Sequence, residues 1–517
     1  MTHIDVFMRG VFCLLCLGSV LEAAEPVAPD SALAVALQAI HGEPLRLQAA
    51  KDAALAQSAP VQMAQSQVRA AAGAVQRERG TFEPEVFAEL KRSGNDQPAS
   101  SPFSGAPVVE QNQTMGQAGV QMTLPIGTEL EAAVVTTRLQ SNSNFSSLNP
   151  QYTTTGNLRF RQPLLDGFFK RKDLTSAERL LDAAQARYDD VVMRTQAQVE
   201  TLYWNLYAAE RDLAVQMLVR DQAEALLKEA QLRAKAGLVG PNQVANAQVF
   251  LASQQLALLD REEALDRVSD DLAALIGVRP EGRVRFWPVD MPQREFDLPP
   301  VDQVVADVLW ENKSLIAIRA DAEALKALAK GADRDRLPTV DLVGAVGGNG
   351  LSGTGQDVVF GADTLRSTAS GGYGDALSQA FKRDYPTWEV GVQVRIPIGN
   401  RSDKGEFERL RAEVGRADQL YAEAVRNLET QVRAECRALA NGKARLQMAG
   451  AGVMAAAEQV RIGLIEYRNG RTTAFELARL SADFATAQQQ YSQALVRTAH
   501  AAANLQYLTS GQYPIKK

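Results

Sequence analysis

Residues 389–400, EVGVQVRIPIGN, run from an alternating apolar and polar pattern into a proline and a glycine, and a long proline-free stretch follows. The same plan appears earlier, where residues 157–167 read NLRFRQPLLDG ahead of another such stretch. Pro163 and Pro397 are 397 − 163 = 234 positions apart. A shared plan at a fixed offset indicates that the chain contains two copies of one unit.

Each copy continues into a helical pattern that is too long for a single globular core. No glycine lies between Gly167 and Gly237, and roughly 65 helical residues at about 1.5 Å each would extend close to 100 Å. In the first copy the apolar positions recur at coiled-coil spacing. These positions are Val199, Leu202, Leu206, Ala209, Leu213 and Met217. The pattern predicts a long helix with a narrow apolar stripe.

Glycine interrupts both helical patterns at the same place. Gly237 and Gly470 are 470 − 237 = 233 positions apart, and a new amphipathic helical pattern follows each of them. Glycine just past a helix end commonly adopts the left-handed conformation that stops the helix. Each copy is therefore predicted to contain a long helix, a tight turn and a returning helix.

Six short segments alternate apolar and polar residues with the period of a β-strand. They fall within residues 85–92, 117–124, 129–134, 157–161, 339–346 and 388–396. In the clearest segment the apolar positions are Trp388, Val390, Val392 and Val394, and the polar positions include Glu389, Gln393 and Arg395. Alternation alone is typical of any half-buried antiparallel sheet.

The charges and loops favour a membrane barrel over an ordinary sheet. Most segments carry charge at their polar positions, and long polar loops such as 93–105 and 347–357 separate them. Strands with an apolar outer face and a polar inner face, joined by long loops on one side, are typical of outer-membrane barrels. Four to six strands cannot close a wide barrel, so either several chains contribute or there is no barrel. We expect the apolar positions of residues 388–396 to face lipid and the polar ones to face the lumen.

The two β regions differ in length. Pro84 and Pro338 are 338 − 84 = 254 positions apart, so about twenty extra residues lie within the first β region, consistent with an extra hairpin near the LPIG turn at residues 124–127.

The predicted layout is a signal peptide at 1–24, an N-terminal segment and first helix at 25–83, a first β-barrel segment at 84–162, a first long helical hairpin at 163–277, a linker at 278–300, a helix at 301–336, a second β-barrel segment at 337–398, a second long helical hairpin at 399–511 and a C-terminal tail at 512–517.

The N-terminus and the composition indicate an exported protein without enzymatic chemistry. An apolar run and small residues follow Arg9, as in a secretory signal peptide cut near Ala23 or Ala24. After cleavage only Cys436 remains, which excludes an intrachain disulfide.

The net charge of −6 argues against a nucleic-acid partner. The three histidines are scattered, and the sequence contains neither a metal-ligand cluster nor a nucleotide-binding loop, so we expect no cofactor.

One glycine motif needs a separate interpretation. Gly348, Gly350 and Gly353 spell G-x-G-x-x-G after a strand pattern, as in dinucleotide-binding proteins. No amphipathic helix follows, and no βαβ context surrounds the motif. We therefore predict an extracellular loop at this position.

Taken in order, these pieces resemble the TolC-like outer-membrane efflux factors. The resemblance covers residues from about 44 to 511. It is carried by the duplicated strand exits QPLLDG and IPIGNR, the turns RAKAGLVGPNQVANAQ and EYRNGRTTAFELARLSADFATAQ, and the helix end LAALIG. It implies a mixed α and β fold, internally duplicated, in which a homotrimer shares one outer-membrane β-barrel that continues as a long α-helical coiled-coil barrel through the periplasm.

The resemblance also implies a function and partners. It implies a passive exit duct that works with a periplasmic adaptor protein and an inner-membrane pump or secretion ATPase. The alternatives are a periplasmic coiled-coil adaptor, which also has long helical hairpins, and a structural scaffold with a soluble β-sandwich. The substrate, whether drug, metal ion or polypeptide, is left open.

Two sets of site residues follow from the same resemblance. Similar proteins close their periplasmic end with inward acidic residues just after the second glycine turn, and these positions fall on Glu476 and Arg479. Arg479 departs from the acidic pattern and can instead pair with Glu476 on one helix face. The adaptor is expected to meet the two glycine turns. The corresponding residues are Arg233, Gly237, Gly470 and Arg471.

Overall fold

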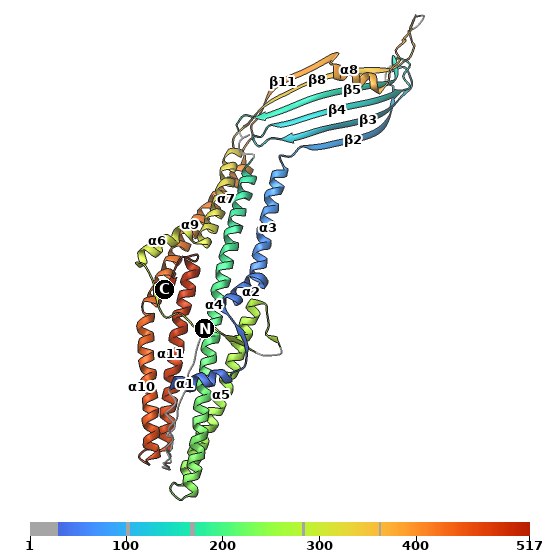
Figure 1. Ribbon diagram of the computed structural model, residues 1–517. Coiled ribbons are helices and arrows are strands. Elements are labelled where there is room, and N and C mark those ends of the chain that lie inside the picture. Colours follow the sequence, from blue (N-terminus) through green and yellow to red (C-terminus); the bar gives the residue numbers. More distant parts are fainter. Residues whose placement is uncertain (1–28, 100–103, 166–170, 282–284, 361–362, 517) are drawn as a thin grey trace, which may run out of the picture.

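The protein is an elongated helical body with a curved β-sheet at one end (Figure 1). The computed structural model describes residues 29–99, 104–165, 171–281, 285–360 and 363–516. Its helices are α1 (Pro29–Ala39), α2 (Leu47–Gln57), α3 (Ala59–Gly80), α4 (Lys172–Lys235), α5 (Pro241–Ile276), α6 (Val301–Glu311), α7 (Lys313–Asp335), α8 (Tyr373–Lys382), α9 (Arg401–Ala440), α10 (Gly442–Arg468) and α11 (Ala474–Leu508). Its strands are β1 (Glu43–Leu45), β2 (Glu85–Pro98), β3 (Val108–Thr123), β4 (Glu129–Ser141), β5 (Leu148–Pro163), β6 (Phe286–Pro288), β7 (Phe296–Asp297), β8 (Thr339–Gly355), β9 (Val358–Phe360), β10 (Asp363–Leu365), β11 (Tyr385–Arg395) and β12 (Ile515–Lys516).

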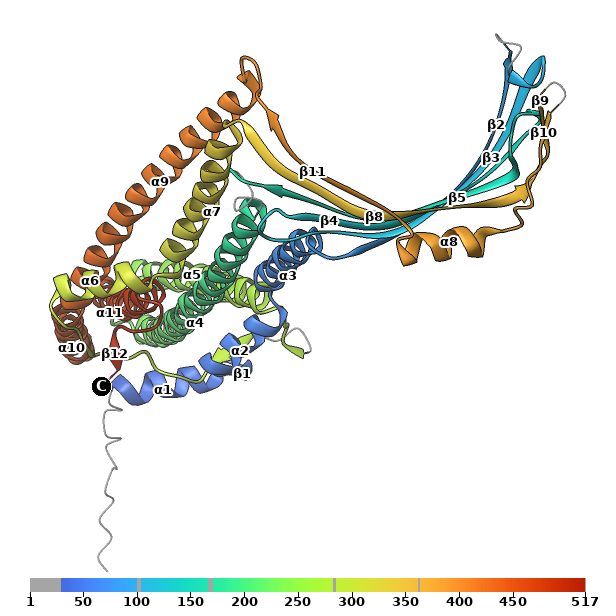
Figure 2. The ribbon, with the colours of Figure 1, turned by 90° about the horizontal axis from the view of Figure 1, so that it is seen from above.

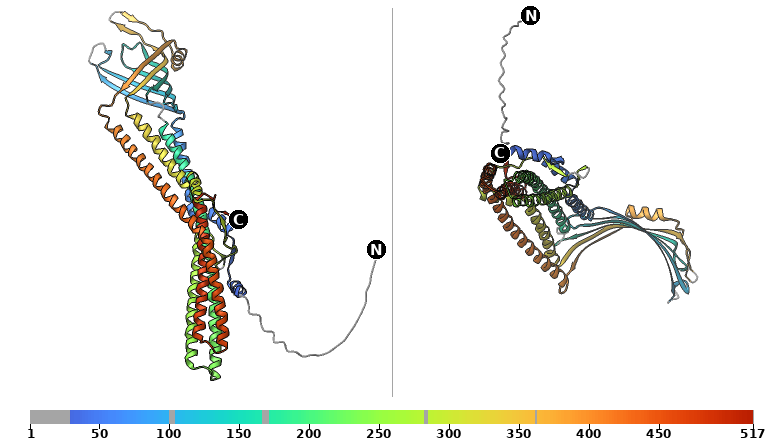
Figure 3. Two further views of the ribbon diagram at one scale, coloured as in Figure 1. Left: turned by 90° about the vertical axis from the view of Figure 1, so that its left-hand side faces the viewer. Right: turned by 90° about the horizontal axis from the view of Figure 1, so that it is seen from below.

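The first copy contains the long helix that the sequence predicts. Helix α4 is continuous over 64 residues, and α5 returns beside it after the turn at Gly237. Neither proline nor glycine interrupts α4, so every internal turn keeps its backbone hydrogen bonds. At about 1.5 Å per residue the helix is about 96 Å long. Figure 3 shows α4, α5, α10 and α11 side by side in one rod.

The second copy differs because its long helix is divided. Helix α9 ends at Ala440 and α10 begins at Gly442, whereas the sequence analysis predicts one helix from the strand exit to Gly470. Asn441 and Gly442 are weak helix formers. A Cβ atom at Gly442 would lie 2.9 Å from the Thr498 side chain, so the glycine permits close packing on α11. The division lets α9 pack on α7 and α10 pack on α11.

The regions predicted as one helix and one linker contain more structure than expected. Residues 301–336 form two helices, α6 and α7, because the side chain of Asn312 accepts a hydrogen bond from the backbone of Leu315 at 3.0 Å and begins a new helix. Residues 278–300 do connect the two copies, but they also supply β6, which pairs with β1, and β7, which pairs with β12. The described part of the tail, residues 512–516, thereby joins the middle of the helical body.

The buried core of the molecule lies in the helical body. One cluster joins α2, α4, α5, β6 and α11, and it includes Val199, Tyr203, Leu206, Leu272 and Phe286. A second cluster joins α6, α9 and α11 around Val304, Val432 and Leu505. The body therefore has a buried core within one chain, while helices α5 and α10 also expose apolar side chains such as Val249, Leu256, Met448 and Met454.

All six predicted strand segments lie in one antiparallel sheet with the order β11-β8-β5-β4-β3-β2. The first copy contributes four of these strands and the second copy two, so β3 and β4 are the extra strands of the first copy. Their turn at residues 124–128 closes through a hydrogen bond from the Leu124 amide to the Thr128 carbonyl at 2.8 Å, with Gly127 at φ +83°. The extra hairpin therefore belongs to the main sheet.

The glycine motif after residue 347 is strand and not loop. Gly348, Gly350 and Gly353 lie in β8 and pair with β5, so the predicted extracellular loop at 347–357 is largely wrong. The pattern is misleading because these glycines lack the side chains from which a strand is recognised. Their role becomes visible only with α8, which the sequence analysis does not predict and which packs against β8 and β5.

One expectation falls outside the described residues, and one search covers only the helices within them. The predicted signal peptide at 1–24 lies outside them. Among the helices that are described, none combines the length and the apolar character needed to cross a membrane.

Candidate functional site

Two adjacent rows of directly opposed residues cross the whole sheet and define its two faces. Such neighbours on adjacent strands project to the same face. One row is mainly polar and consists of Glu389, Ala345, Arg159, Glu131, Gln121 and Glu85. The next row is apolar and consists of Trp388, Val346, Leu158, Ala132, Val120 and Val86. The alternation predicted for single segments therefore extends across all six strands.

Helix α8 shows which face is which. It lies on the convex side of the curved sheet (Figures 2 and 3). A Cβ atom at Gly350 would come within 1.8 Å of the Ala376 carbonyl oxygen in α8, and one at Gly348 within 2.3 Å of the Ala380 carbonyl oxygen. Gly348 and Gly350 share their face with Val346, so the apolar row is convex and the polar row is concave.

The predicted face residues of β11 sort in the same way. Trp388, Val390, Val392 and Val394 lie on the convex face, whereas Glu389, Gln393 and Arg395 lie on the concave face. Trp388 is 77% exposed and Val392 is 63% exposed in the single chain. A row of large apolar side chains open to water is unfavourable, so this face needs a nonpolar environment.

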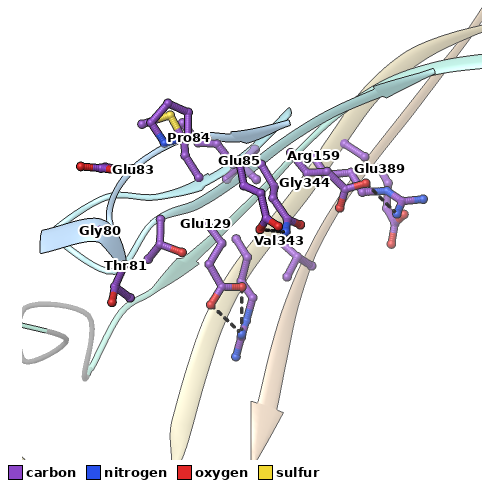
Figure 4. A pocket seen from close by; sticks show the side chains of 18 residues that line it. Gly80, Thr81, Glu83, Pro84, Glu85, Glu129, Arg159, Val343, Gly344 and Glu389 are labelled. Carbon is purple, nitrogen blue, oxygen red and sulfur yellow. Dashed lines mark hydrogen bonds and ion pairs between the residues drawn. The ribbon is translucent and has the colours of Figure 1, made fainter. Parts of the chain in front are cut away.

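Charged residues gather on the concave face where the strands meet the helical body. They line a pocket of about 900 Å³ (Figure 4). Arg161 is held there by Asp341, with 2.6 Å between Nη2 and Oδ2, and by Glu129 at 3.2 Å. Arg159 lies 3.9 Å from Glu131. Among the described residues Glu389 has no ion-pair partner, so the pocket keeps an unneutralised carboxylate.

The two glycine turns have the same local geometry. Gly237 has φ +73° and Gly470 has φ +71°. After each glycine the next amide reaches back five residues, from Leu238 to the Arg233 carbonyl and from Arg471 to the Glu466 carbonyl, both at 2.9 Å. These bonds form the Schellman motif and satisfy carbonyls at the helix ends. Both turns lie at the end of the rod that is far from the sheet (Figure 1).

Arg233 connects the two turns. Its guanidinium donates to the carbonyl oxygens of Tyr467 at 3.1 Å and Arg468 at 3.3 Å, and it lies 4.5 Å from the centroid of the Tyr467 ring. These carbonyls belong to the last turn of α10, where a cation is favourable. Tyr467 is 1% exposed and packs with Leu226, Leu477 and Ala230. Arg233 therefore stabilises the tip, whereas Arg471 is exposed at the turn.

Glu476 and Arg479 form the helical pair that the sequence analysis gives as the alternative to an acidic ring. They lie in the first turns of α11, and Arg479 Nε donates to Glu476 Oε2 at 3.2 Å. This hydrogen bond lowers the pKa of the Glu476 carboxyl and raises the pKa of the Arg479 guanidinium. Asp483 lies 3.7 Å from the other side of Arg479, a contact that the sequence analysis does not identify.

Candidate metal ligands and cysteines give no further site in the parts of the chain that the structure describes. These residues contain no cluster of three or more histidine, cysteine or carboxylate side chains suited to a metal ion. Cys436 is a free, buried thiol within α9. The features with a functional geometry are therefore the two-faced sheet and the far tip of the rod.

Comparison with known proteins agrees with this geometry. The family model for outer membrane efflux proteins matches residues 51–278 and 304–511. Among curated proteins, Protein CyaE of Bordetella pertussis is 27% identical over 179 residues, which are 35% of this chain and 38% of that protein. The match therefore spans well under half of CyaE.

Solved structures of outer-membrane channels share the fold. The outer-membrane channel OprN is 17% identical, with a TM-score of 0.66 over 90% of each chain. The CmeC channel of Campylobacter jejuni is 14% identical, with a TM-score of 0.66 over 90% of this chain and 86% of CmeC. The outer membrane protein VceC of Vibrio cholerae is 16% identical, with a TM-score of 0.63 over 90% of this chain and 96% of VceC.

Proposed function

Because this chain belongs to the outer membrane efflux protein family, we propose that it is the passive exit duct of a tripartite efflux or type I secretion system. In this role it carries substrate from an inner-membrane transporter to the outside of the cell. The observation that carries the proposal is the curved sheet, which is apolar on its convex face and charged on its concave face. Lipid covers the first face and water fills the space beside the second.

The sheet cannot act as a duct by itself. Six strands form an open layer, and the convex residues such as Trp388 and Val392 are exposed. Three copies related by a threefold axis place 3 × 6 = 18 strands around one lumen. This number is in the range of barrels that enclose an aqueous channel. The protein is accordingly proposed to be a homotrimer in the outer membrane.

The helical body extends the duct toward the inner membrane. Helix α4 is about 96 Å long, so it reaches far into the periplasm when the sheet is in the membrane. At its tip, Gly237, Gly470 and Arg471 form an accessible surface for an adaptor protein, and Glu476 and Arg479 surround the closed end of the tunnel. Energy for transport comes from the partner, an inner-membrane pump or a secretion ATPase.

The periplasmic adaptor is the weaker alternative. An adaptor works in water, where its β domains must bury their apolar side chains within the protein. Here the large apolar residues of β11 lie open on one side of a single-layered sheet. The family match over both copies also favours the duct.

Fractionation followed by electrical recording tests the proposal. We expect the mature protein in the outer-membrane fraction, as a trimer after extraction in mild detergent. In planar bilayers the trimer should give discrete conductance steps. A soluble periplasmic protein, or a detergent-extracted monomer without conductance, would contradict the proposed duct.

A further inference from the structure

The two outer strands of the sheet, β2 and β11, have complementary edges. Within the described residues, each of these strands pairs with one neighbour only, β2 with β3 and β11 with β8. Strand β2 leaves the helical body at Glu85, and β11 returns to it at Arg395. The two strands therefore run in opposite directions. Unpaired edges of this length are normally covered in native proteins.

We propose that β11 of one copy pairs antiparallel with β2 of the next copy, with Arg395 opposite Glu85, and that three copies close in this register into an 18-stranded barrel. The inference rests on the trimer of the proposed function and adds the seam between its subunits. All residues of β11, from Tyr385 to Arg395, then face residues 85–95 of the neighbouring β2.

The charges on the concave face select this register. Arg395 faces Glu85, and Glu389 faces Lys91, so two pairs of opposite charge lie across the seam. A slip of two residues in one direction places Glu389 opposite Glu89, which is unfavourable. A slip in the other direction places Glu389 opposite Ser93 and Arg395 opposite Phe87, which leaves both charges without partners.

The remaining edge residues agree with the same register. Among the described residues of a single chain, Lys91, Glu389 and Arg395 form no ion pair. On the convex face, Val394 meets Val86 and Val390 meets Leu90, and all four are largely exposed in the single chain. The convex side of the seam is thus apolar near the helical body, and toward the outer end of β2 Trp388 meets Arg92.

Barrel geometry provides an independent check. Within one chain the row that begins at Glu85 ends at Glu389. At the seam Glu389 faces Lys91, so the row advances by 91 − 85 = 6 residues along β2 for each copy. Around three copies the total stagger, which is the shear of the barrel, is 3 × 6 = 18 residues. This shear equals the number of strands, and equal values give a strand tilt of about 36°. This tilt lies in the range of about 35–45° seen in closed barrels.

The register also sets the width of the lumen. Eighteen strands spaced by about 4.8 Å and tilted by about 36° give a circumference of about 107 Å and a backbone diameter of about 34 Å. A barrel of this size encloses a water-filled channel. The narrowest part of the duct is therefore expected in the helical body and not in the membrane.

Cysteine cross-linking tests the register directly. In a Cys436→Ala background, Thr387→Cys with Ser93→Cys places the two thiols opposite each other on the concave face. The matched control is Thr387→Cys with Asn95→Cys, which is two residues out of register on the same face. After mild oxidation we expect covalent trimers on non-reducing gels for the first pair and little linkage for the control.

The outcomes separate this inference from the proposed function. Linkage through Asn95 in preference to Ser93 would overturn the register. Failure of both pairs in a protein that still forms trimers would place the seam at other strands, while the duct would stand. A protein that stays monomeric in the outer membrane would contradict the trimer itself.

Charge reversal adds a second measurement. Lys91→Glu should lower the temperature at which the detergent-resistant trimer dissociates, because Glu389 then faces a like charge. The double variant Lys91→Glu, Glu389→Lys should recover at least half of that loss. The mismatched double variant Lys91→Glu, Glu85→Lys should recover none of it. Equal behaviour of the two double variants would contradict the pairing of Glu389 with Lys91.

Discussion

The helical body and the β-sheet differ in what a single chain can complete. In the body, Val199, Leu206 and Leu272 are fully enclosed by neighbouring helices. In the sheet, residues of the same apolar character such as Trp388 and Val392 remain exposed, and among the described residues neither outer edge has a strand partner. A single chain therefore completes a packed core in the body, whereas no face of the sheet is completed without lipid or other copies.

The largest effect is expected on the convex face of the sheet. Val392→Asp places a charge on this face and costs about 2–4 kcal/mol per chain near the middle of the membrane, with Asp toward the lower end. Gln393→Asp, one residue away, faces the concave side and stays in water. The yield of detergent-resistant trimer from outer membranes should collapse for Val392→Asp only. A similar loss for both variants would show that the faces are wrongly assigned.

The next effect tests the body as a self-contained core. Glu210 in α4 is 4% exposed, and burial raises the pKa of its carboxyl from 4.5 to about 7. Because the pKa of this carboxyl is raised in the folded protein, ionising it lowers the free energy of unfolding. This loss of stability is absent below pH 4.5, grows as the pH rises and is complete above pH 7. Glu210→Gln removes it. At pH 8 we expect a gain of about 2–3 kcal/mol, and at pH 4.5 almost none.

Thermal unfolding of the purified protein at these two pH values measures this difference. Glu224→Gln is the matched control because Glu224 lies exposed on the same helix. It should change the free energy of unfolding by less than about 0.5 kcal/mol at either pH. A gain for Glu210→Gln that does not depend on pH would contradict the buried, titrating carboxyl.

A smaller effect is expected at the tip of the body. Arg233→Ala removes two hydrogen bonds to carbonyls of α10 and the stacking on Tyr467, which should cost about 1–3 kcal/mol locally. Arg471→Ala should cost less than about 0.5 kcal/mol because this side chain is exposed. Hydrogen exchange of the tip amides should accelerate for Arg233→Ala alone. Adaptor binding should weaken for Arg471→Ala, and equal exchange in both variants would contradict the structural role of Arg233.

The smallest change in stability is expected at the paired charges of α11. Glu476 and Arg479 are solvated, so their substitution should affect ion flow more than folding. Arg479→Glu adds one acidic group per chain beside Glu476 and Asp483, and in a trimer it should increase cation selectivity and loosen closure. The effect should fall with salt as the charges are screened. Bilayer conductance that is unchanged by both Arg479→Glu and Glu476→Gln would place these residues outside the tunnel.

The sequence alone predicted the structure correctly where the residue pattern of a single segment indicates its conformation. The period of two in β11 predicted its two faces, and the absence of glycine and proline predicted α4 at nearly its full length. Gly237 and Gly470 marked both turns because a left-handed backbone conformation favours glycine. The duplication and the resemblance to outer-membrane efflux factors followed from the order of such local patterns.

Only the tertiary structure decided which segments meet. The strand character of Gly348 and Gly350 depends on pairing with β5 and on the close approach of α8, and neither contact is encoded by the glycines themselves. The polar sequence around Arg233 is typical of an exposed helix end. Its guanidinium nevertheless donates to the carbonyl oxygens of Tyr467 and Arg468, more than two hundred residues away in the chain. Pairing across such distances depends on the packing of the whole molecule, whereas periodicity reports the preference of one segment at a time.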